Sequence, residues 1–543
     1  MMTQHTKLFV RFITAVVLVV ADPHPCRTVP AEVPTREGEA ALKKIRELRK
    51  QTAQRKRRLI FHSDGRPMDN ETIVFPHLPG TQTDACTYSL IHQFNLARLY
   101  RTEVAQPWPP GSLEEYGDGP DDLERYVAFC RENAYEAFWA QRMNDTHDCA
   151  DTENGRWKFE TNNFKQEHPE FLIGERRTES PSSPDEKWRL EDFIQCPHGR
   201  WSSVDYAHEE VRELLFRSWE EVCKNYDLDG LMFDFFRHPT FFRSTAWGKR
   251  ASEQEVEMMT ELLRRTRKMA DELGAKRGRP FLFIARTPDS PGYCKGLGLD
   301  IQRWMEEDLI DIWLATGYHR MQEWDEIVRL GHKHGVPVWA SMDESRVPPR
   351  ELHNTREAYR ARAMNMWNAG VDAIYLFNFF YKPPQAQFEL LHELGDPAKL
   401  AYLDKMYVPD ARGHGNLDYW LKDGDAFDKL PRSLPVRFDA GESKTTVNIL
   451  IGDDLTAARA KGYAVSAELH LQFEELSSQE GLSVTLNDET LRSGTLSDSR
   501  IRFVLAPELV KKGTNRIGVA FKPGPEAMQV LTGVRLWTKY DVQ

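Results

Sequence analysis

Residues 229–239 read DGLMFDFFRHP, and the order of residue types in this stretch predicts the architecture of the chain. A polar turn, Asp229-Gly230, leads into the apolar run 231–233, which ends at the carboxylate of Asp234. A continuous apolar run is typical of a strand buried on both faces, as in a parallel sheet. The amphipathic segment 209–226 predicts a helix that feeds this strand. A helix, a buried strand and polar groups at the strand's carboxyl end together predict an α/β barrel with Asp234 at the centre of its active site.

Short apolar runs alternate with helical patterns between residues 59 and 410, which is typical of repeated βα units. The runs lie at 59–63, 87–92, 137–142, 230–233, 281–285, 310–315, 336–341 and 373–377. Eight units predict a (β/α)8 TIM barrel over residues 59–410. The largest predicted insertion, 145–202, lies between the third and fourth strands. Its tryptophans, Trp157, Trp188 and Trp201, are candidate platforms for sugar rings.

Helix boundaries are marked between these runs. Ser252 with Glu255 forms a capping box ahead of one predicted helix. Asn354 with Glu357 begins another, which ends at Gly370 just before the eighth run. A glycine at the end of a helix suits the left-handed backbone conformation that commonly terminates it.

The pattern changes after residue 410. Residues 411–428 are polar and contain glycine, and we expect a linker there. Residues 429–543 contain short runs separated by turn residues, at 445–451, 467–473, 482–486, 501–505, 516–521 and 533–538. Several short strands at this spacing predict an all-β sandwich domain after the barrel.

The amino-terminal 21 residues have a basic start and an apolar core at 12–21, which predict a signal peptide and a secreted or periplasmic protein. Residues 22–58 predict a linker and a basic, solvated helix. No later stretch is apolar for long enough to predict a membrane span. A net charge of −11 argues against a nucleic-acid partner, which usually requires a basic face. Seven scattered cysteines without CxxC spacing indicate neither a disulfide framework nor a zinc module.

Polar side chains follow nearly every predicted strand, at the rim where barrel enzymes carry their chemistry. Burying them without partners would be unfavourable, so they either pair with one another or hold a polar ligand, and we favour the ligand. The candidate substrate-binding residues are Asp64, Arg142, Asn144, Asp145, His147, Arg237, His238, Arg286, Tyr318, His319, Asp343 and Asn378.

Glycoside hydrolysis is the chemistry that best uses this set, because it needs two carboxylates flanking one bond. We predict Asp234 and Glu344, after the fourth and seventh strands, as this pair. The alternative for Asp234 is a structural ion pair with Arg237 or Arg286, and for Glu344 an ion pair with Arg346. The sequence leaves open which carboxylate is the acid.

The residues around Asp234 resemble a known family. The segment 205–212 (DYAHEEVR), the turn 226–230 (YDLDG) and Asp234 are similar to the glycosyl-hydrolase-like family 10 barrels. Residues 142–145 (RMND), 234–239 (DFFRHP) and Ser345-Arg346 look like a bacterial branch with an appended β-sandwich. The resemblance covers 59–410 and is most specific at 203–239. It implies a (β/α)8 fold and a carbohydrate-active role centred on Asp234.

Two rival functions remain open. One is a non-catalytic carbohydrate-binding barrel; the other is a polysaccharide lyase that uses His238 or Tyr318 as base and Arg142 to neutralise a uronate. The arginines and histidines of the rim would suit a sulfated or uronic sugar. No dinucleotide fingerprint and no phosphate-binding loop occurs, and the HxH pattern of metal-dependent hydrolases is absent from the first strand, so we predict no cofactor and no metal.

Overall fold

The computed structural model describes residues 36–64, 75–92, 94–97, 100–107, 111, 113–147, 162–177, 192–316, 319–342, 355–377, 379, 384–409, 416–430, 434–439, 443–522 and 528–542. The predicted signal peptide at 1–21 lies outside these residues. No helix among them is long and apolar enough to cross a membrane.

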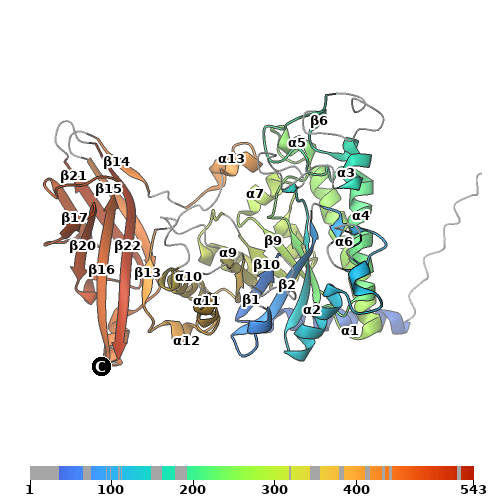
Figure 1. The fold of residues 1–543 in the computed structure, drawn as a ribbon, viewed down its shortest axis with the longest axis horizontal. Coiled ribbons are helices and arrows are strands. Elements are labelled where there is room, and N and C mark those ends of the chain that lie inside the picture. Colours follow the sequence, from blue (N-terminus) through green and yellow to red (C-terminus); the bar gives the residue numbers. More distant parts are fainter. Residues whose placement is uncertain are drawn as a thin grey trace, which may run out of the picture.

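A closed parallel barrel forms the larger domain, on the right of Figure 1. Its strands follow the order β1-β12-β11-β10-β9-β8-β5-β2, and the pairing of β1 with β2 closes the ring. The predicted TIM barrel is confirmed. The strands are β1 (Leu59–Ser63), β2 (Thr83–His92), β5 (Glu136–Arg142), β8 (Gly230–Asp234), β9 (Leu282–Thr287), β10 (Ile312–Ala315), β11 (Val338–Met342) and β12 (Ala373–Leu376).

Helices surround the strands. Ser252 and Glu255 form the predicted capping box of α6, which ends at the left-handed Gly278. Gly335 and Gly370 are likewise left-handed, at the ends of α9 and α10. The main helices around the barrel are α2 (Asp122–Glu132), α4 (Glu209–Asn225), α6 (Glu253–Arg277), α7 (Pro291–Gly296), α8 (Ile301–Glu306), α9 (Trp324–Lys333), α10 (Arg356–Asn368) and α11 (Pro384–Leu391).

The turn before β8 is explained by two close contacts. Gly230 lies so near β9 that an added Cβ would come within 2.0 Å of the Leu282 carbonyl oxygen. The Asp229 carboxylate accepts hydrogen bonds from the Ala137 amide and from Arg131, both at 2.7 Å. Asp229-Gly230 therefore sets how β8 enters the sheet between β5 and β9.

Alternation along each strand separates two apolar layers. In β8, Leu231 and Phe233 pack against the helices, whereas Met232 joins Phe138, Ile284 and other residues inside the barrel. Because strand side chains alternate with a period of two, the residue after Phe233 faces inward again. Asp234 therefore lies in the uppermost interior layer of the barrel, above the apolar fill.

The sequence predicts a solvated basic helix, but helix α1 (Arg36–Ala53) is partly buried against the barrel. Ala53 belongs to the apolar cluster inside the barrel, and Arg49 is buried. The Arg49 guanidinium lies 2.6 Å from an Asp308 carboxylate oxygen and 3.4 Å from one of Asp311. Helix α1 covers the end of the barrel opposite the rim, so part of its positive charge is used within the fold (Figure 1).

Two antiparallel sheets form the carboxy-terminal domain, on the left of Figure 1. The apolar faces of the two sheets enclose a second core that includes Val447, Leu469, Ile517 and Leu536. One sheet contains β13 (Lys405–Tyr407), β14 (Val436–Phe438), β16 (Tyr463–Phe473), β19 (Thr495–Ser497), β20 (Arg500–Leu505) and β22 (Gln529–Val542). The other contains β15 (Ser443–Ile451), β17 (Leu482–Leu486), β18 (Glu489–Thr490) and β21 (Gly513–Phe521).

The two domains interleave at their junction. Strand β13 precedes residue 410, where the sequence places the domain boundary, yet it pairs with β22 of the sandwich. Residues 416–430, expected to be linker, return to the barrel, where the Tyr293 hydroxyl donates to the Leu417 carbonyl at 2.9 Å. On the other side, the Asn365 and Asn368 amides of α10 donate to backbone carbonyls at the end of β15, at 3.0 and 2.8 Å.

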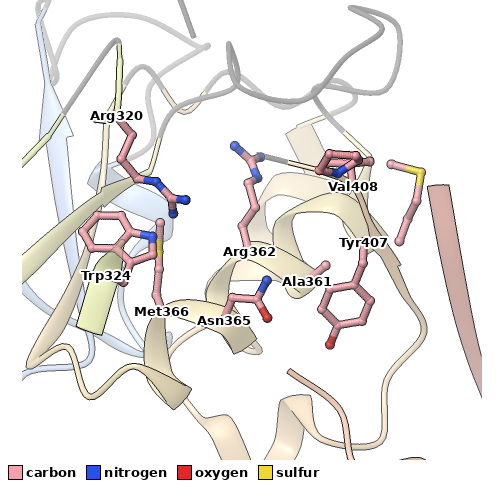
Figure 2. Close-up of a pocket in the computed structure, with 10 residues that line it drawn as sticks. Arg320, Trp324, Ala361, Arg362, Asn365, Met366, Tyr407 and Val408 are labelled. Carbon is pink, nitrogen blue, oxygen red and sulfur yellow. The ribbon is translucent and has the colours of Figure 1, made fainter. Parts of the chain in front are cut away.

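A cavity of about 50 Å³ lies at this junction. Figure 2 shows Trp324 on one side of it, Tyr407 of β13 on the other, and Asn365 of α10 between them. A space of this size admits a water molecule or two but no sugar ring. The cavity is therefore an imperfection of the packing between domains and not a saccharide site.

The role of helix α1 in closing the lower end of the barrel can be tested by substitution. We expect Arg49→Ala to lower the free energy of unfolding by about 3 kcal/mol, because the buried Asp311 then keeps only Arg267 as its cation and the buried Arg49 side chain is lost. Urea denaturation followed by circular dichroism measures the change. The neighbouring Lys50, whose side chain is 64% exposed, is the matched control. Lys50→Ala should change stability by no more than about 0.5 kcal/mol. Equal effects of the two substitutions would contradict a structural role for α1.

Candidate active site

Asp234 ends β8 between two arginines on neighbouring strands. The strand register pairs it with Arg142 of β5 on one side and Arg286 of β9 on the other. Arg286 Nη1 donates to Asp234 Oδ2 at 2.7 Å, and the Phe236 amide donates to Oδ1 at 3.0 Å. The Asp234 side chain is only 4% exposed and Arg286 is fully buried. The structural ion pair weighed for Asp234 is thus present, with Arg286 and not Arg237 as the partner.

Aromatic rings enclose this ion pair. The Arg286 guanidinium carbon lies 3.8 Å from the centre of the Phe377 ring and 5.7 Å from that of Tyr375. Attraction between the cation and the ring faces offsets part of the free energy lost when the arginine leaves water. Arg286 is therefore held in place from β12 as well as by Asp234.

Arg142 joins two further carboxylates beside Asp234. Its Nη2 lies 2.9 Å from Asp64 Oδ1, and its Nη1 donates to Asp145. Burial alone would raise the pKa of Asp64 and Asp145, but the Arg142 charge lowers both well below their usual range. A carboxyl with so low a pKa is ionised at neutral pH and cannot serve as a general acid. Asp64 and Asp145 are therefore excluded as proton donors.

The same network continues to β8 through His147. The Nδ1 atom of His147 hydrogen-bonds Asp145, and its Nε2 lies 3.0 Å from Arg237 Nη2. Because arginine can only donate, His147 Nε2 accepts and the proton sits on Nδ1. His147 is therefore a neutral relay between the Asp145 carboxylate and the Arg237 guanidinium.

His238 is also neutral. Its Nδ1 accepts a hydrogen bond from the Thr146 amide at 3.0 Å, which places its proton on Nε2. Burial lowers the pKa of His238 well below its ordinary value, and the charge of Asp145 only partly opposes this shift. Its side chain retains 12% exposure. His238 is therefore a hydrogen-bond donor at the mouth across the whole neutral pH range.

Asn144 does not face the mouth, although the sequence suggested a binding role. Its amide nitrogen donates to the Val204 and Thr240 carbonyls at 3.1 and 2.5 Å, and its oxygen accepts from the Val204 amide at 3.0 Å. The buried Lys165 ammonium donates to the Asp145 carbonyl at 3.0 Å. Asn144 and Lys165 anchor the insertion to the rim and leave no group of Asn144 for a substrate.

Three of these residues are close enough together to be considered as metal ligands. Asp145, His147 and His238 place one ligand atom each within 4.8 Å of one another. Each of these atoms already has a hydrogen-bond partner, and the Arg142 and Arg237 guanidiniums lie in the same cluster. Two adjacent cations disfavour a third. The donor set therefore fits a hydrogen-bonded relay better than a metal site.

Of the predicted residues that remain, His319 is buried, and the others lie outside the described residues. His319 is 3% exposed and packs against Phe236, with 4.7 Å between ring centres. Asp289, which also follows β9, is fully buried and accepts hydrogen bonds from the Met321 and Gln322 amides. Burial raises the pKa of Asp289 to about 6. Tyr318, Asp343, Glu344 and Asn378 lie outside the described residues, as do Trp157 and Trp188.

Sequence reasoning missed three side chains at the mouth. Trp420 and Tyr419, in the segment expected to be linker, lie on the rim, where Trp420 stacks on His238. Arg200 of the insertion lies against Tyr419. An aromatic pair within an otherwise polar stretch was the available signal. Nothing in the local pattern shows that the stretch returns to the barrel.

No protein-family model matches the sequence, and neither does any curated protein. Among solved structures, the glycoside hydrolase domain of PgaB (BpsB) from Bordetella bronchiseptica is 9% identical over 63% of this chain and 99% of its own, with a TM-score of 0.37. A family 18 N-acetylglucosaminidase from Paenibacillus barengoltzii is 11% identical over 62% and 99%, with a TM-score of 0.36. The maltogenic alpha-amylase AmyB from Thermotoga neapolitana is 11% identical over 86% and 98%, also at 0.36. Similarity this distant identifies no family, substrate or catalytic residue.

The pairing of Arg142 predicts a stability effect that depends on pH. We expect Arg142→Met to lower the free energy of unfolding by about 3 to 5 kcal/mol at pH 7, because the buried Asp145 and the half-buried Asp64 both lose the cation that lies closest to them. In the wild type their lowered pKa values stabilise the fold above about pH 4, and this contribution is lost as pH falls through those values. In the variant the two pKa values rise, so its deficit should shrink between pH 7 and pH 4.5.

Urea denaturation at several pH values measures this deficit. Arg217→Met, which removes an exposed arginine from α4, is the matched control and should stay within about 0.5 kcal/mol of wild type. A deficit that is the same at pH 7 and pH 4.5 would show that Arg142 does not act by neutralising the two carboxylates.

Proposed function

We propose that this protein is an exported glycoside hydrolase that cleaves a poly- or oligosaccharide at the barrel mouth, with Asp234 and Glu344 as its two carboxylates. The observation that carries the proposal is the setting of Asp234. It lies at the end of β8 in the uppermost interior layer, and both of its oxygens accept hydrogen bonds. The resemblance of residues 203–239 to the glycosyl-hydrolase-like family 10 barrels supports the same assignment.

The hydrogen bonds of Asp234 assign its role within that pair. Arg286 donates to one oxygen of Asp234 and a backbone amide donates to the other, so both oxygens act as acceptors and neither is placed as a donor. An ionised carboxylate acts as nucleophile or as base toward water, and the leaving oxygen then needs a separate acid. We assign that acid to Glu344, which follows β11, three strands from β8 around the barrel.

Four half-buried residues of the network remain for the saccharide. Asp64, His147, Arg237 and His238 keep part of their surface at the mouth, whereas Arg142, Asp145 and Arg286 are buried beneath them. Polar groups held in place by mutual hydrogen bonds can bind sugar hydroxyls without being ordered first. The buried members thus position the exposed ones.

A second candidate is a carbohydrate-binding barrel without catalysis. The observation that favours it is the burial of Asp234 and its ion pair with Arg286. The lyase receives less support. Arg142 already balances two carboxylates, and the exposed nitrogen of His238 carries a proton and is therefore no base.

Substitution of Asp234 separates these functions. We expect the wild type to release reducing ends from one member of a panel of neutral, uronic and sulfated polysaccharides, and Asp234→Asn to lose roughly a thousandfold or more of that activity. Asp227→Asn, which lies three residues before the same strand begins and is exposed, is the matched control and should retain activity. Circular dichroism confirms that the variants are folded.

Other outcomes reject the assignment in distinct ways. An Asp234→Asn variant as active as wild type would exclude Asp234 from catalysis. Saturable binding to a polysaccharide with no turnover would favour the non-catalytic barrel. Products that absorb in the near ultraviolet would indicate the new double bond of the sugar that a lyase forms, and elimination would then replace hydrolysis as the proposed reaction.

A further inference from the structure

The short helix α13 (Leu417–Trp420) places two aromatic rings at the barrel mouth. Tyr419 is 37% exposed, one of few large apolar side chains to reach that level in the part of the chain that the structure describes, and Trp420 is half-buried. The two rings meet edge to face, with 4.7 Å between their centres. Figure 1 shows α13 at the same end of the barrel as α5 (Arg243–Ala246) and α7.

Backbone contacts hold α13 rigidly against the barrel. His198 Nδ1 donates to the Asp418 carbonyl at 2.6 Å, and the Gly199 amide donates to the Tyr419 carbonyl. Leu417 and Leu421, on either side of the aromatic pair, are completely buried in the barrel's apolar cluster. The rings are therefore presented by an ordered support, which lowers the entropy lost on binding a ligand.

Trp420 is joined to the candidate active site through His238. The two rings stack with 5.9 Å between their centres and 24° between their planes. His238 lies four residues after Asp234, and its Nε2–H is the donor that the Thr146 contact leaves available. An aromatic ring and a fixed donor thus stand side by side at the rim, four residues along the chain from Asp234.

Arg200 adds a positive charge to the same group. Its guanidinium carbon lies 5.6 Å from the centre of the Tyr419 ring, and the side chain is exposed. No ion pair joins Arg200 to a carboxylate among the residues described between 36 and 542. In a chain with a net charge of −11, an exposed arginine held by an aromatic ring and not by an acid is positioned for an anion from outside.

We propose that Arg200, His238, Tyr419 and Trp420 form a substrate subsite that binds a sugar ring carrying an oxyanion, either a uronate carboxylate or a sulfate ester. The aromatic rings pack against the C–H face of the sugar, Arg200 pairs with the oxyanion, and His238 Nε2–H donates to a ring substituent. The subsite deepens the proposed function and rests on it only in taking the ligand to be a saccharide.

Binding measured without turnover tests the subsite separately from catalysis. Isothermal titration calorimetry in the Asp234→Asn background would compare polygalacturonate, carrageenan and dextran as uronic, sulfated and neutral ligands. We expect tight binding of one anionic polymer and weaker binding of dextran. Trp420→Ala should weaken that binding by roughly tenfold or more. Arg200→Ala should weaken it by a similar factor and make it less sensitive to NaCl, because the screened ion pair is gone.

Matched variants control for indirect effects. Tyr463→Ala removes an aromatic ring stacked on Tyr402 in the sandwich, and Arg217→Ala removes an exposed arginine from α4; neither should alter binding. Arg200→Lys should recover part of the affinity. Arg200 is exposed, so its variants keep the test valid even if Trp420→Ala is poorly folded.

Each result of these titrations either supports or overturns the subsite. Polygalacturonate or carrageenan as the tighter ligand identifies the oxyanion as carboxylate or sulfate, and either supports the subsite. Wild-type affinity in both Trp420→Ala and Arg200→Ala would overturn it, as would dextran bound as tightly as the anionic polymers or no binding at all. The catalytic assignment is judged separately, by the reducing ends that Asp234→Asn releases, and the subsite by the ratio of affinities between the Trp420 or Arg200 variants and their common Asp234→Asn parent, so the two failures remain distinguishable.

Discussion

The pairing of carboxylates with guanidiniums in the top interior layer of the barrel is the constraint on which the rest of the site depends. Strand alternation directs Arg142, Asp234 and Arg286 inward, above an apolar fill. Leaving one of these charges unpaired there would be strongly destabilising. Arg286 is therefore balanced by Asp234, and Arg142 by Asp64 and Asp145. Each charge in this layer is therefore tolerated only while its partner of opposite sign is present.

This pairing limits the chemistry available to each group. Carboxylates held ionised by arginine are suited to act as nucleophiles, bases or hydrogen-bond acceptors, and unsuited to donate protons. The neutral tautomers of His147 and His238 follow from the same contacts, since each accepts a hydrogen bond at one ring nitrogen. A proton donor for hydrolysis must then come from elsewhere on the rim, which is why the proposed acid is Glu344.

Two segments outside the βα repeats complete the barrel at its ends. Helix α1 covers the lower end through buried Arg49, and residues 416–430 build one side of the mouth. Helix α1 is attached by ion pairs, and residues 416–430 by hydrogen bonds, to groups far away in sequence. The sandwich is fixed to α10 by Asn365 and Asn368, so the segment between the domains is held at both ends and can present Trp420 in a defined position.

The sequence by itself determined the barrel, the strands that form it and the presence of Asp234 at a strand end, because strand alternation, helix caps and apolar runs are local patterns. It also determined that a second, all-β domain follows. Only the tertiary structure decided which charges pair, that Asn144 is consumed by backbone contacts, and that Trp420 lies over His238. Those outcomes depend on strand register and on contacts between segments more than a hundred residues apart, such as Tyr293 with Leu417, which no local pattern encodes.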